Sequence, residues 1–364
     1  MAEKRYLCLY FFIPNDMQLY PLKFEPILKK IIWGGDEIGR FKNLEVQESG
    51  IGESWEVSQV PGSISVVANG ELKGKSLTEL MELAPEALLG KSVYARFGKE
   101  FPLLIKFIDA RDNLSIQVHP DDLLARKRHN SFGKTEMWYV IASKPGAKLV
   151  SGFSKQIDAG EYERRIAENS IEDVLQQHEA KAGDVFFLPA GRVHAIGAGL
   201  FIAEIQQSSN ITYRLYDYNR KDAQGNGREL HTEQAKDAID YKLYNDLKTV
   251  YEPVENDAVP LVSCSYFTTN RVQLKADASG YEDIVTEKGR QQVLMTETVE
   301  MDRDYTGLDS FVIYVCMQGE GFIAYGNDQT ISIRQGETVL LPACLDGATL
   351  STSSVLLLLE TYIR

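Results

Sequence analysis

The sequence contains no apolar run long enough to cross a membrane. A transmembrane helix needs roughly 18 or more consecutive apolar residues, and no such run occurs in the 364 residues, which have a mean hydropathy of −0.23. The first 15 residues are apolar but lack a small-residue cleavage site after a long apolar core. We therefore expect neither a membrane span nor a secretion signal.

Cysteine is scarce, and its spacing is uninformative for metal binding. The four cysteines, Cys8, Cys264, Cys316 and Cys344, form no CxxC pair. In a chain of this length they predict buried thiols in a reducing compartment instead of a disulfide framework. We expect the protein to be cytoplasmic.

Basic residues are outnumbered by acidic ones. The chain has 39 Lys and Arg against 52 Asp and Glu, a net charge of −13. A nucleic-acid-binding protein normally carries a basic surface, so that class of partner is excluded. The residues from Asp246 to Arg364 account for −10, and the preceding residues carry only −3. An anionic substrate therefore meets less repulsion on the first two-thirds of the chain.

Helical patterns are few, and short strand-like segments dominate. These segments are rich in Val, Ile, Phe and Tyr and span 53–60, 63–68, 102–109, 114–118, 136–141, 184–188, 200–207, 311–317, 321–325 and 354–362. Helices are expected after the capping-box sequence at Ser76, within 158–178 with Ser170 as a cap, and over 232–243. A charged linker over 245–260 precedes the last strands. We predict a mainly-β catalytic body with helical insertions, followed by a smaller all-β domain.

One sequence pattern occurs twice, about 150 residues apart. Gly183 and Gly336 each begin the pattern Gly-acidic-x-x-x-Leu-Pro. Each copy fits a turn, a strand and a second turn, which is typical of one β-barrel unit used twice. Chance similarity is the alternative for so short a window.

Gln117 and His119 form the first candidate site. On a strand, residues two apart share a face, so both side chains project together while Ile116 and Val118 pack on the other side. Buried polar side chains need a partner, and a metal ion would satisfy both. A hydrogen-bonded pair at the rim of a barrel is the alternative.

Lys134 and Glu136 show the same spacing. The carboxylate could complete a metal site, and the lysine on the same face could meet an anion. The alternative is an exposed ion pair, contributing about 0–1 kcal/mol.

His194 ends a longer motif, Gly-x5-Pro-x-Gly-x2-His, that starts at Gly183. Glycine and proline define the turns and place the histidine at the start of the next strand. With His119, Glu136 and Gln117 it completes a set of nitrogen and oxygen donors suited to Zn²⁺, Mn²⁺ or Fe²⁺. Open coordination positions would make such an ion a Lewis acid.

Arg214 lies in an aromatic-rich stretch that should be at least half buried. A buried arginine needs an anionic partner, either a substrate phosphate or a protein carboxylate such as Asp217. Glu204 alternates with Gln206 along the preceding strand and is a further candidate for the site.

The ordered motifs of the chain closely resemble the type I mannose-6-phosphate isomerase family in its short bacterial form. They are Tyr20-Pro-Leu-Lys-Phe, Trp33-Gly-Gly, Glu53-Ser-Trp-Glu-Val-Ser, Pro102-Leu-Leu-Ile-Lys, Leu114-Ser-Ile-Gln-Val-His-Pro-Asp, Lys134-Thr-Glu-Met-Trp, Leu188-Pro-Ala-Gly-Arg-Val-His-Ala and Asn210-Ile-Thr-Tyr-Arg-Leu-Tyr-Asp. The resemblance runs from about residue 19 to the C-terminus. Asn210 departs from the family pattern, in which an Asp is frequent at this position.

This resemblance implies a fold, a metal and an activity. It implies two cupin-type (jelly-roll) β-barrels, with an N-terminal extension over 1–18, a catalytic domain over 19–250 and a degenerate cupin-like domain over 251–364. It also implies interconversion of mannose 6-phosphate and fructose 6-phosphate, a reaction of carbohydrate metabolism, with zinc as cofactor. The residues matching the family's zinc ligands are Gln117, His119, Glu136 and His194, and those matching its active-site cations are Lys134 and Arg214.

The chemistry of an aldose–ketose isomerisation agrees with these residues. A proton moves between C1 and C2 through a cis-enediol, which requires a base and stabilisation of negative charge on oxygen. Lys134 and Glu204 are candidates for the base. An Fe²⁺-dependent cupin dioxygenase and a non-catalytic sugar-phosphate-binding cupin are the alternatives.

The second copy of the repeated pattern lacks the metal-binding residues of the first. Aligning Gly336 with Gly183 places Gly347 at the position of His194, and no histidine follows His231. We therefore expect one metal ion per chain.

Overall fold

The chain is organised as two compact units. A computed structural model describes residues 18–45, 48–221, 224–286 and 289–364. Unit 1 contains the described residues up to Glu25, then Val66–Glu100 and Tyr251–Arg364, and unit 2 contains Pro26–Ser65 and Phe101–Val250. The division into 19–250 and 251–364 stays a prediction. In the structure, contacts group residues 66–100 with the C-terminal strands. Except for Gln18, the predicted extension 1–18 lies outside the described residues.

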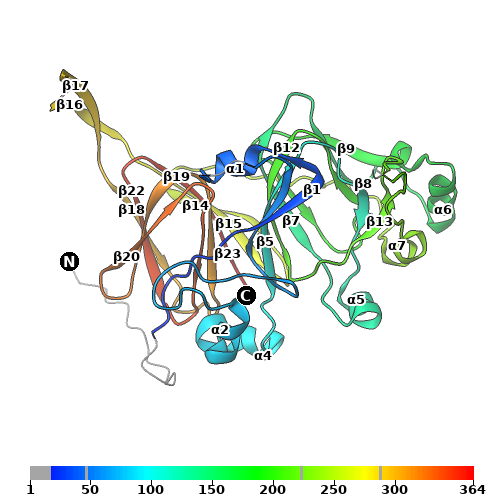
Figure 1. Cartoon of the computed structure of the whole chain (residues 1–364), viewed down its shortest axis with the longest axis horizontal. Coiled ribbons are helices and arrows are strands. Elements are labelled where there is room, and N and C mark those ends of the chain that lie inside the picture. Colours follow the sequence, from blue (N-terminus) through cyan, green and yellow to red (C-terminus); the bar gives the residue numbers. More distant parts are fainter. Residues whose placement is uncertain (1–17, 46–47, 222–223, 287–288) are drawn as a thin grey trace. The chain divides into compact units, whose positions relative to one another are not determined.

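Unit 2 consists of two antiparallel sheets (Figure 1). The six-stranded sheet has the order β1 (Ile27–Gly35), β2 (Ile51–Val57), β5 (Leu103–Ala110), β12 (Leu200–Gln207), β7 (Glu136–Ser143) and β10 (Val185–Leu188). The five-stranded sheet has the order β13 (Tyr213–Tyr216), β6 (Ile116–Val118), β11 (His194–Ile196), β8 (Lys148–Phe153) and β9 (Leu175–Glu179). A short ribbon pairs β3 (Gln59–Val60) with β4 (Ser63–Ile64).

The central strands β5 and β12 carry charged residues inside an apolar sheet. Every residue of both strands is buried. In the strand register Glu204 lies opposite Lys106 on one side and Trp138 on the other. Residues opposite each other across a ladder project to the same face, so the pleat brings these side chains together.

Helices cover the five-stranded sheet of unit 2 on its outer face. Helices α6 (Ala159–Ala167) and α7 (Thr232–Ala238) contribute Tyr162 and Ala235 to the core that packs against β6 and β11. The remaining helices of this unit are α1 (Glu37–Phe41), α5 (Asp122–His129) and a 3₁₀ helix over Ile171–Val174. Ser170 occupies the predicted N-cap position of this 3₁₀ helix, but its side chain makes no capping hydrogen bond. The helix expected up to residue 178 ends early because β9 pairs with β8.

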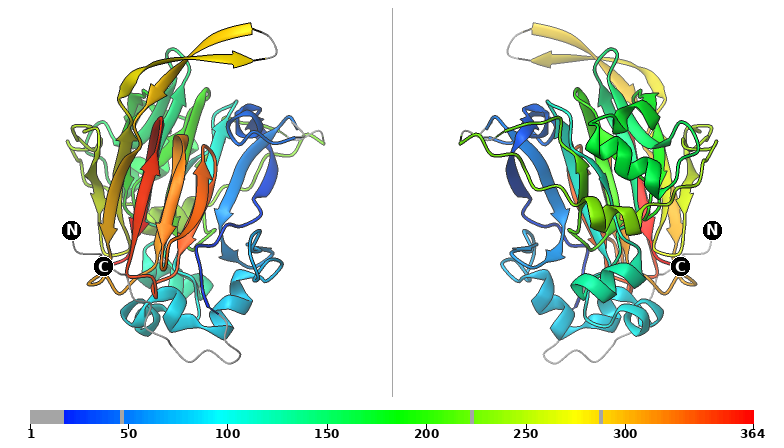
Figure 2. Two further views of the ribbon diagram at one scale, coloured as in Figure 1. Left: turned by 90° about the vertical axis from the view of Figure 1, so that its left-hand side faces the viewer. Right: turned by 90° about the vertical axis from the view of Figure 1, so that its right-hand side faces the viewer.

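Unit 1 is built on one curled antiparallel sheet (Figure 2). Its strands are β14 (Asp257–Ser263), β15 (Thr268–Lys275), β23 (Val355–Tyr362), β19 (Val312–Tyr325), β22 (Gly347–Thr352) and β18 (Val299–Asp304), with β20 (Gln329–Arg334) and β21 (Thr338–Leu341) on β19. Strands β16 (Ala278–Thr286) and β17 (Gly289–Thr296) form a hairpin that extends from this sheet. Its helices are α2 (Leu77–Leu83), α3 (Pro85–Leu89) and α4 (Lys91–Phe97), and the predicted capping box of Ser76 with Glu79 is present. The predicted mainly-β fold class with two barrel-like units is confirmed.

The repeated glycine–proline pattern occupies equivalent places in the two units. Gly183 and Gly336 both adopt positive φ, at 87° and 80°, and precede β10 and β21. Strand β10 pairs with β7 as β21 pairs with β19, and in each unit the next neighbour is the long strand β12 or β23. This shared strand order supports one supersecondary unit used twice.

The register of these strands aligns individual positions of the two units. Leu188 lies opposite Glu136 in unit 2, and the matching Leu341 lies opposite Val312 in unit 1. Val312 therefore takes the place of Glu136. Following the same register one strand further, from β7 to β12 and from β19 to β23, places Glu360 at the position of Glu204.

Glu360 is completely buried and is neutralised by its own unit. Its oxygens accept hydrogen bonds from Nε and Nη2 of Arg303 at 2.8 and 2.7 Å and from Nδ2 of Asn270 at 2.8 Å. The hydroxyl of Tyr305, which also contacts Tyr314, donates to the same carboxylate. A buried carboxylate with this many donors is satisfied without a bound ion.

Glu360→Ala should destabilise the protein by about 3–5 kcal/mol, because it leaves the partly buried Arg303 without its carboxylate. Urea unfolding followed by circular dichroism measures the loss. The double variant Arg303→Met/Glu360→Leu removes both charges and should be less destabilised than the single variant. Equal or greater loss in the double variant would contradict a charge-compensation role.

Candidate metal centre and substrate cavity

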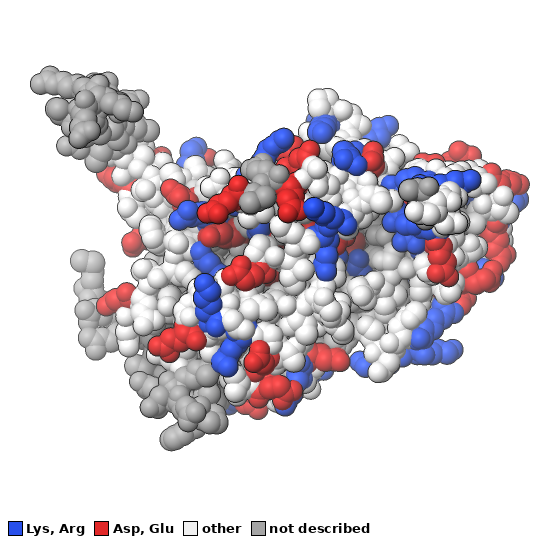
Figure 3. Space-filling model, in the orientation of Figure 1, with Lys and Arg blue, Asp and Glu red and all other residues white. Residues whose placement is uncertain are grey.

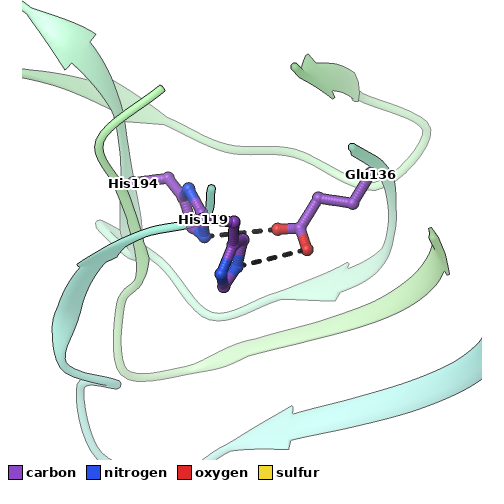
Figure 4. A group of neighbouring side chains, drawn as sticks. All are labelled: His119, Glu136 and His194. Atoms are coloured by element: carbon purple, nitrogen blue, oxygen red, sulfur yellow. Dashed lines mark ion pairs between the residues drawn. The ribbon is translucent and has the colours of Figure 1, made fainter. Parts of the chain in front are cut away.

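Three buried side chains of unit 2 converge on one point (Figure 4). His119 follows β6, Glu136 begins β7 and His194 begins β11. Nε2 of His119 lies 3.5 Å from Oε2 of Glu136, and Nε2 of His194 lies 3.3 Å from Oε1. One potential ligand atom from each residue lies within 4.8 Å of the others. Among the described residues this is the one group of His, Cys, Asp and Glu with metal-binding geometry.

Backbone carbonyls orient both imidazoles. Nδ1 of His119 lies 2.9 Å from the carbonyl oxygen of Ile211, and Nδ1 of His194 lies 2.9 Å from that of Arg192. Each Nδ1 must carry the proton to donate this bond, so each Nε2 presents a lone pair to the centre. Such hydrogen bonds are the usual support of metal-binding histidines.

Glu136 lacks the hydrogen bonds that a buried carboxylate requires. It is 0% exposed, and neither oxygen accepts a well-formed hydrogen bond from a residue that the structure describes. Burial, with the nearby charge of Glu204, raises the pKa of Glu136 to about 7. Burial lowers the pKa of His194 to about 4 and that of His119 well below its usual range. Two neutral imidazoles and an unsatisfied carboxylate form a donor set that fits a divalent cation.

Gln117 and Lys134 border this group. Nε2 of the Gln117 amide lies 3.2 Å from Nε2 of His194, and rotation of the amide by half a turn would present its oxygen instead. Nζ of Lys134 lies 3.1 Å from both Oε2 of Glu136 and Nε2 of His119. Lys134 is buried, so the interpretation of this residue as an exposed ion pair is wrong.

Two glycines allow the turns that carry these residues. A Cβ on Gly133 would lie 2.6 Å from backbone atoms of Asp121 and Asp122, so only glycine permits this close approach beside Lys134. Gly191 has a φ of 91°, and its N–H donates to the carbonyl of His119 at 2.9 Å. The second turn therefore ties the strand of His194 to that of His119.

A cavity of about 390 Å³ opens beside the centre, within unit 2. Its apolar wall includes Trp33, Trp55, Ile108, Leu114 and Ile196. Its polar lining includes Glu53, Lys106, Ser115, Gln117, Lys134, Glu204, Asn210, Thr212, Arg214 and Arg228.

Lys106 and Glu204 form a buried ion pair in this cavity. Nζ of Lys106 lies 3.2 Å from Oε1 of Glu204 and 3.9 Å from Oε2 of Glu53, while Nε1 of Trp138 donates to Glu204 at 2.8 Å. Burial alone would lower the pKa of Lys106, but the two carboxylates outweigh it and raise the pKa. Burial would raise the pKa of Glu204, yet Lys106 and Lys134 lower it. Lys106 ends the Pro102-Leu-Leu-Ile-Lys motif, and the pattern around it predicted no role for this residue.

Arg214 has no carboxylate partner among the described residues. Its Nε donates to Oγ of Ser115 at 3.3 Å and its Nη1 to the carbonyl of Glu229 at 2.8 Å. Asp217 instead pairs with Arg220 and Arg228. The expected alternative of a structural pair between Arg214 and Asp217 is therefore wrong.

Three arginines thus surround a single buried carboxylate at one end of the cavity. Burial lowers the pKa of Arg214, and the positive charge of Arg228 lowers it further. Figure 3 shows Lys and Arg side chains bordering a hollow on the face of unit 2. An excess of guanidinium groups over carboxylates is typical of an anion-binding site.

The fold and this centre define a mainly-β protein with a candidate metal site next to an anion-binding cavity. Residues 22–141 match the catalytic-domain model of type I phosphomannose isomerase. The chain is 34% identical to a mannose-6-phosphate isomerase of Streptococcus mutans, over 88% of this chain and 92% of that protein. It is 37% identical to a mannose-6-phosphate isomerase of Bacillus subtilis, over 72% and 82%.

A solved structure agrees with these relatives. The crystal structure of mannose 6-phosphate isomerase from Bacillus subtilis superposes with a TM-score of 0.77 and 29% identity, covering 94% of this chain and 99% of that one. The chain belongs to the type I phosphomannose isomerase family. Among its described residues, no helix has both the length and the hydropathy of a transmembrane span.

His119→Ala and His194→Ala should each lose bound metal, because each removes one of the Nε2 donors of the centre. Elemental analysis of the purified protein should give one ion per wild-type chain and a small fraction of an ion in either variant. His129→Gln, which removes an exposed histidine outside the group, serves as the control. Full occupancy in either alanine variant, or two tightly bound ions per wild-type chain, would contradict the assignment.

Proposed function

We propose that the protein interconverts mannose 6-phosphate and fructose 6-phosphate, with zinc as its metal. The observation that carries this proposal is the position of the His119–Glu136–His194 group beside a cavity. Gln117 and Lys134, which border the group, line this cavity together with Arg214, which has no carboxylate partner among the described residues. Family membership supports the reaction, since the relatives bear this name. It does not favour the alternatives of a dioxygenase or a non-catalytic binding protein.

The proposed ligands are Gln117, His119, Glu136 and His194, holding one zinc ion per chain. The unsatisfied oxygens of Glu136 and the fixed tautomers of both histidines support this assignment. The ion, when bound, supplies a Lewis acid that stabilises negative charge on the oxygens of the sugar. In unit 1, Val312 replaces the carboxylate and Gly347 a histidine, which supports a single ion per chain.

The isomerisation moves one proton from C2 to C1 and one from O2 to O1, and it leaves the overall oxidation state of the sugar unchanged. The base removes the C2 proton, the electron pair of the C2–H bond becomes part of the C1=C2 bond, and the C1 aldehyde oxygen takes up a proton, which gives the cis-enediol. The C2 hydroxyl then loses its proton and becomes a carbonyl, while C1 accepts a proton. Glu204 and Lys134 are the two buried groups of the cavity lining that we propose for this proton transfer. Glu204 is the candidate base, since Lys106 and Lys134 keep it ionised.

Arg214 is proposed to bind the phosphate of the substrate. Its guanidinium lines the cavity and has only neutral hydrogen-bond partners, so it can accept a dianion. Lys134, close to the metal ligands, is proposed to donate a hydrogen bond to the sugar oxygens as charge develops on them.

We further propose a cupin-type fold for the catalytic unit and a cytoplasmic location for the protein. The two facing antiparallel sheets of unit 2 support the first proposal. The described cysteines, Cys264, Cys316 and Cys344, are free thiols, in keeping with a reducing compartment.

A coupled assay that detects fructose 6-phosphate tests the reaction. The purified protein should convert mannose 6-phosphate, lose activity on dialysis against a chelator, and regain it when zinc is restored. Turnover that survives removal of all bound metal would contradict metal dependence. Oxygen uptake without isomerisation would favour the dioxygenase.

Arg214→Ala should lower kcat/KM for mannose 6-phosphate by about 10- to 100-fold while leaving metal content and melting temperature near wild type. The reason is that the side chain serves the substrate instead of the core. Arg164→Ala, which removes an exposed arginine of α6, is the control. A variant that unfolds would instead assign Arg214 to stability.

A further inference from the structure

Arg228 is a second arginine of the cavity whose role the sequence motifs did not indicate. It lies after β13, in a stretch without helix or strand, and its side chain is 31% exposed. It lines the same cavity as Arg214. Its charge is close enough to Arg214 to lower the pKa of that residue. Two like charges held together at a cavity wall favour a ligand of opposite charge.

Asp217 fixes the orientation of the Arg228 guanidinium. Nε of Arg228 donates to Oδ2 of Asp217 at 2.7 Å, and Nη2 donates to Oδ1. This two-point contact uses one edge of the planar group. Among the described residues nothing accepts a hydrogen bond from Nη1, so the edge formed by Nη1 and Nη2 remains available to an oxyanion.

Asp217 cannot neutralise the cations around it. The same carboxylate, 4% exposed, also accepts from Arg220, so it balances one of two arginines. Arg214, nearby, has only neutral partners in the described part of the chain. Three arginines set against Asp217 and Glu229, whose charge also acts on Arg214, leave an excess of positive charge that favours a phosphate ester, which is a dianion near neutral pH.

We infer that Arg228 and Arg214 together clamp the phosphoryl group of the substrate, and that Asp217 is the positioning residue that aims Arg228. This inference rests on the proposed function and adds a second phosphate-binding residue to it. The two guanidiniums offer separate N–H groups to the three terminal oxygens of a phosphate ester. A single arginine could contact two of them with one edge and leave the third without a charged donor.

Arg220 provides a matched control within the same cluster. It pairs with Asp217 as Arg228 does, but it is not part of the cavity lining, and its Nη1 donates to the carbonyl of Asn113 at 2.6 Å. Arg220→Gln therefore removes an equivalent ion pair from the same carboxylate without removing a donor from the cavity.

The test uses the metal-loaded enzyme and two probes, mannose 6-phosphate and inorganic phosphate. Arg228→Gln should raise both KM for the sugar phosphate and Kd for inorganic phosphate by about 10- to 100-fold, with kcat and metal content changed much less. Asp217→Asn should raise the same two constants to a smaller extent, and Arg220→Gln, which removes a charge but no donor from the cavity lining, should raise them least. Titration calorimetry measures Kd, and steady-state kinetics separate KM from kcat.

Inorganic phosphate affinity in Arg228→Gln equal to that in Arg220→Gln would overturn the inference. If Arg228→Gln does not fold, Arg228→Lys replaces it: lysine keeps the charge but loses the planar edge, so wild-type Kd in that variant would also overturn the clamp. If wild-type protein binds phosphate through Arg228 but does not isomerise mannose 6-phosphate, the clamp stands and the proposed reaction is wrong. If it isomerises the sugar and Arg228→Gln has normal KM, the reaction stands and the clamp is wrong.

Discussion

The carboxylate of Glu136 imposes the constraint on which the catalytic unit depends. It is buried from solvent, and within the described part of the chain no group donates a well-formed hydrogen bond to either oxygen. A buried charge of this kind is unfavourable by several kcal/mol unless a cation compensates it. Lys134 supplies part of that charge at 3.1 Å, while two imidazoles are held neutral with their lone pairs toward the same point. The geometry leaves the remaining compensation to a ligand.

The two units compensate the charge of a buried carboxylate in different ways. In unit 1 the equivalent of Glu204 is Glu360, and Arg303, Asn270 and Tyr305 satisfy it completely. In unit 2 Glu204 is paired with Lys106 but still faces the cavity. Unit 1 thus holds its inner carboxylate in a structural ion pair, whereas the inner carboxylate of unit 2 lines a cavity. This difference supports the proposal that only one of the two units carries an active centre.

Local sequence patterns predicted those parts of the site that depend on strand alternation. The spacing predicted that Gln117 lies beside His119 and Lys134 beside Glu136, although His119 follows β6 and Lys134 precedes β7. The glycine–proline motif placed His194 at the start of a strand. Long-range pairing could not be predicted in the same way. Nothing within the window around Arg214 reveals that Asp217 is already occupied by Arg228, 11 residues further on. Lys106 could have been found, because a charge inside the apolar run of β5 signals a buried partner.

Positive charges along the cavity differ in whether a carboxylate balances them. Carboxylates near the candidate metal centre balance Lys106 and Lys134, so the charges of both lysines are neutralised within the protein. Arg214 is not balanced, although its chain carries a net charge of −13 and has acidic residues in excess. A half-buried guanidinium without a carboxylate is unfavourable in free energy. The proposed binding of a phosphate dianion would recover that free energy, so the charge would contribute to affinity for a phosphorylated ligand. A neutral sugar could not use this contribution, so on this proposal the arginines of the cavity would determine specificity as well as affinity.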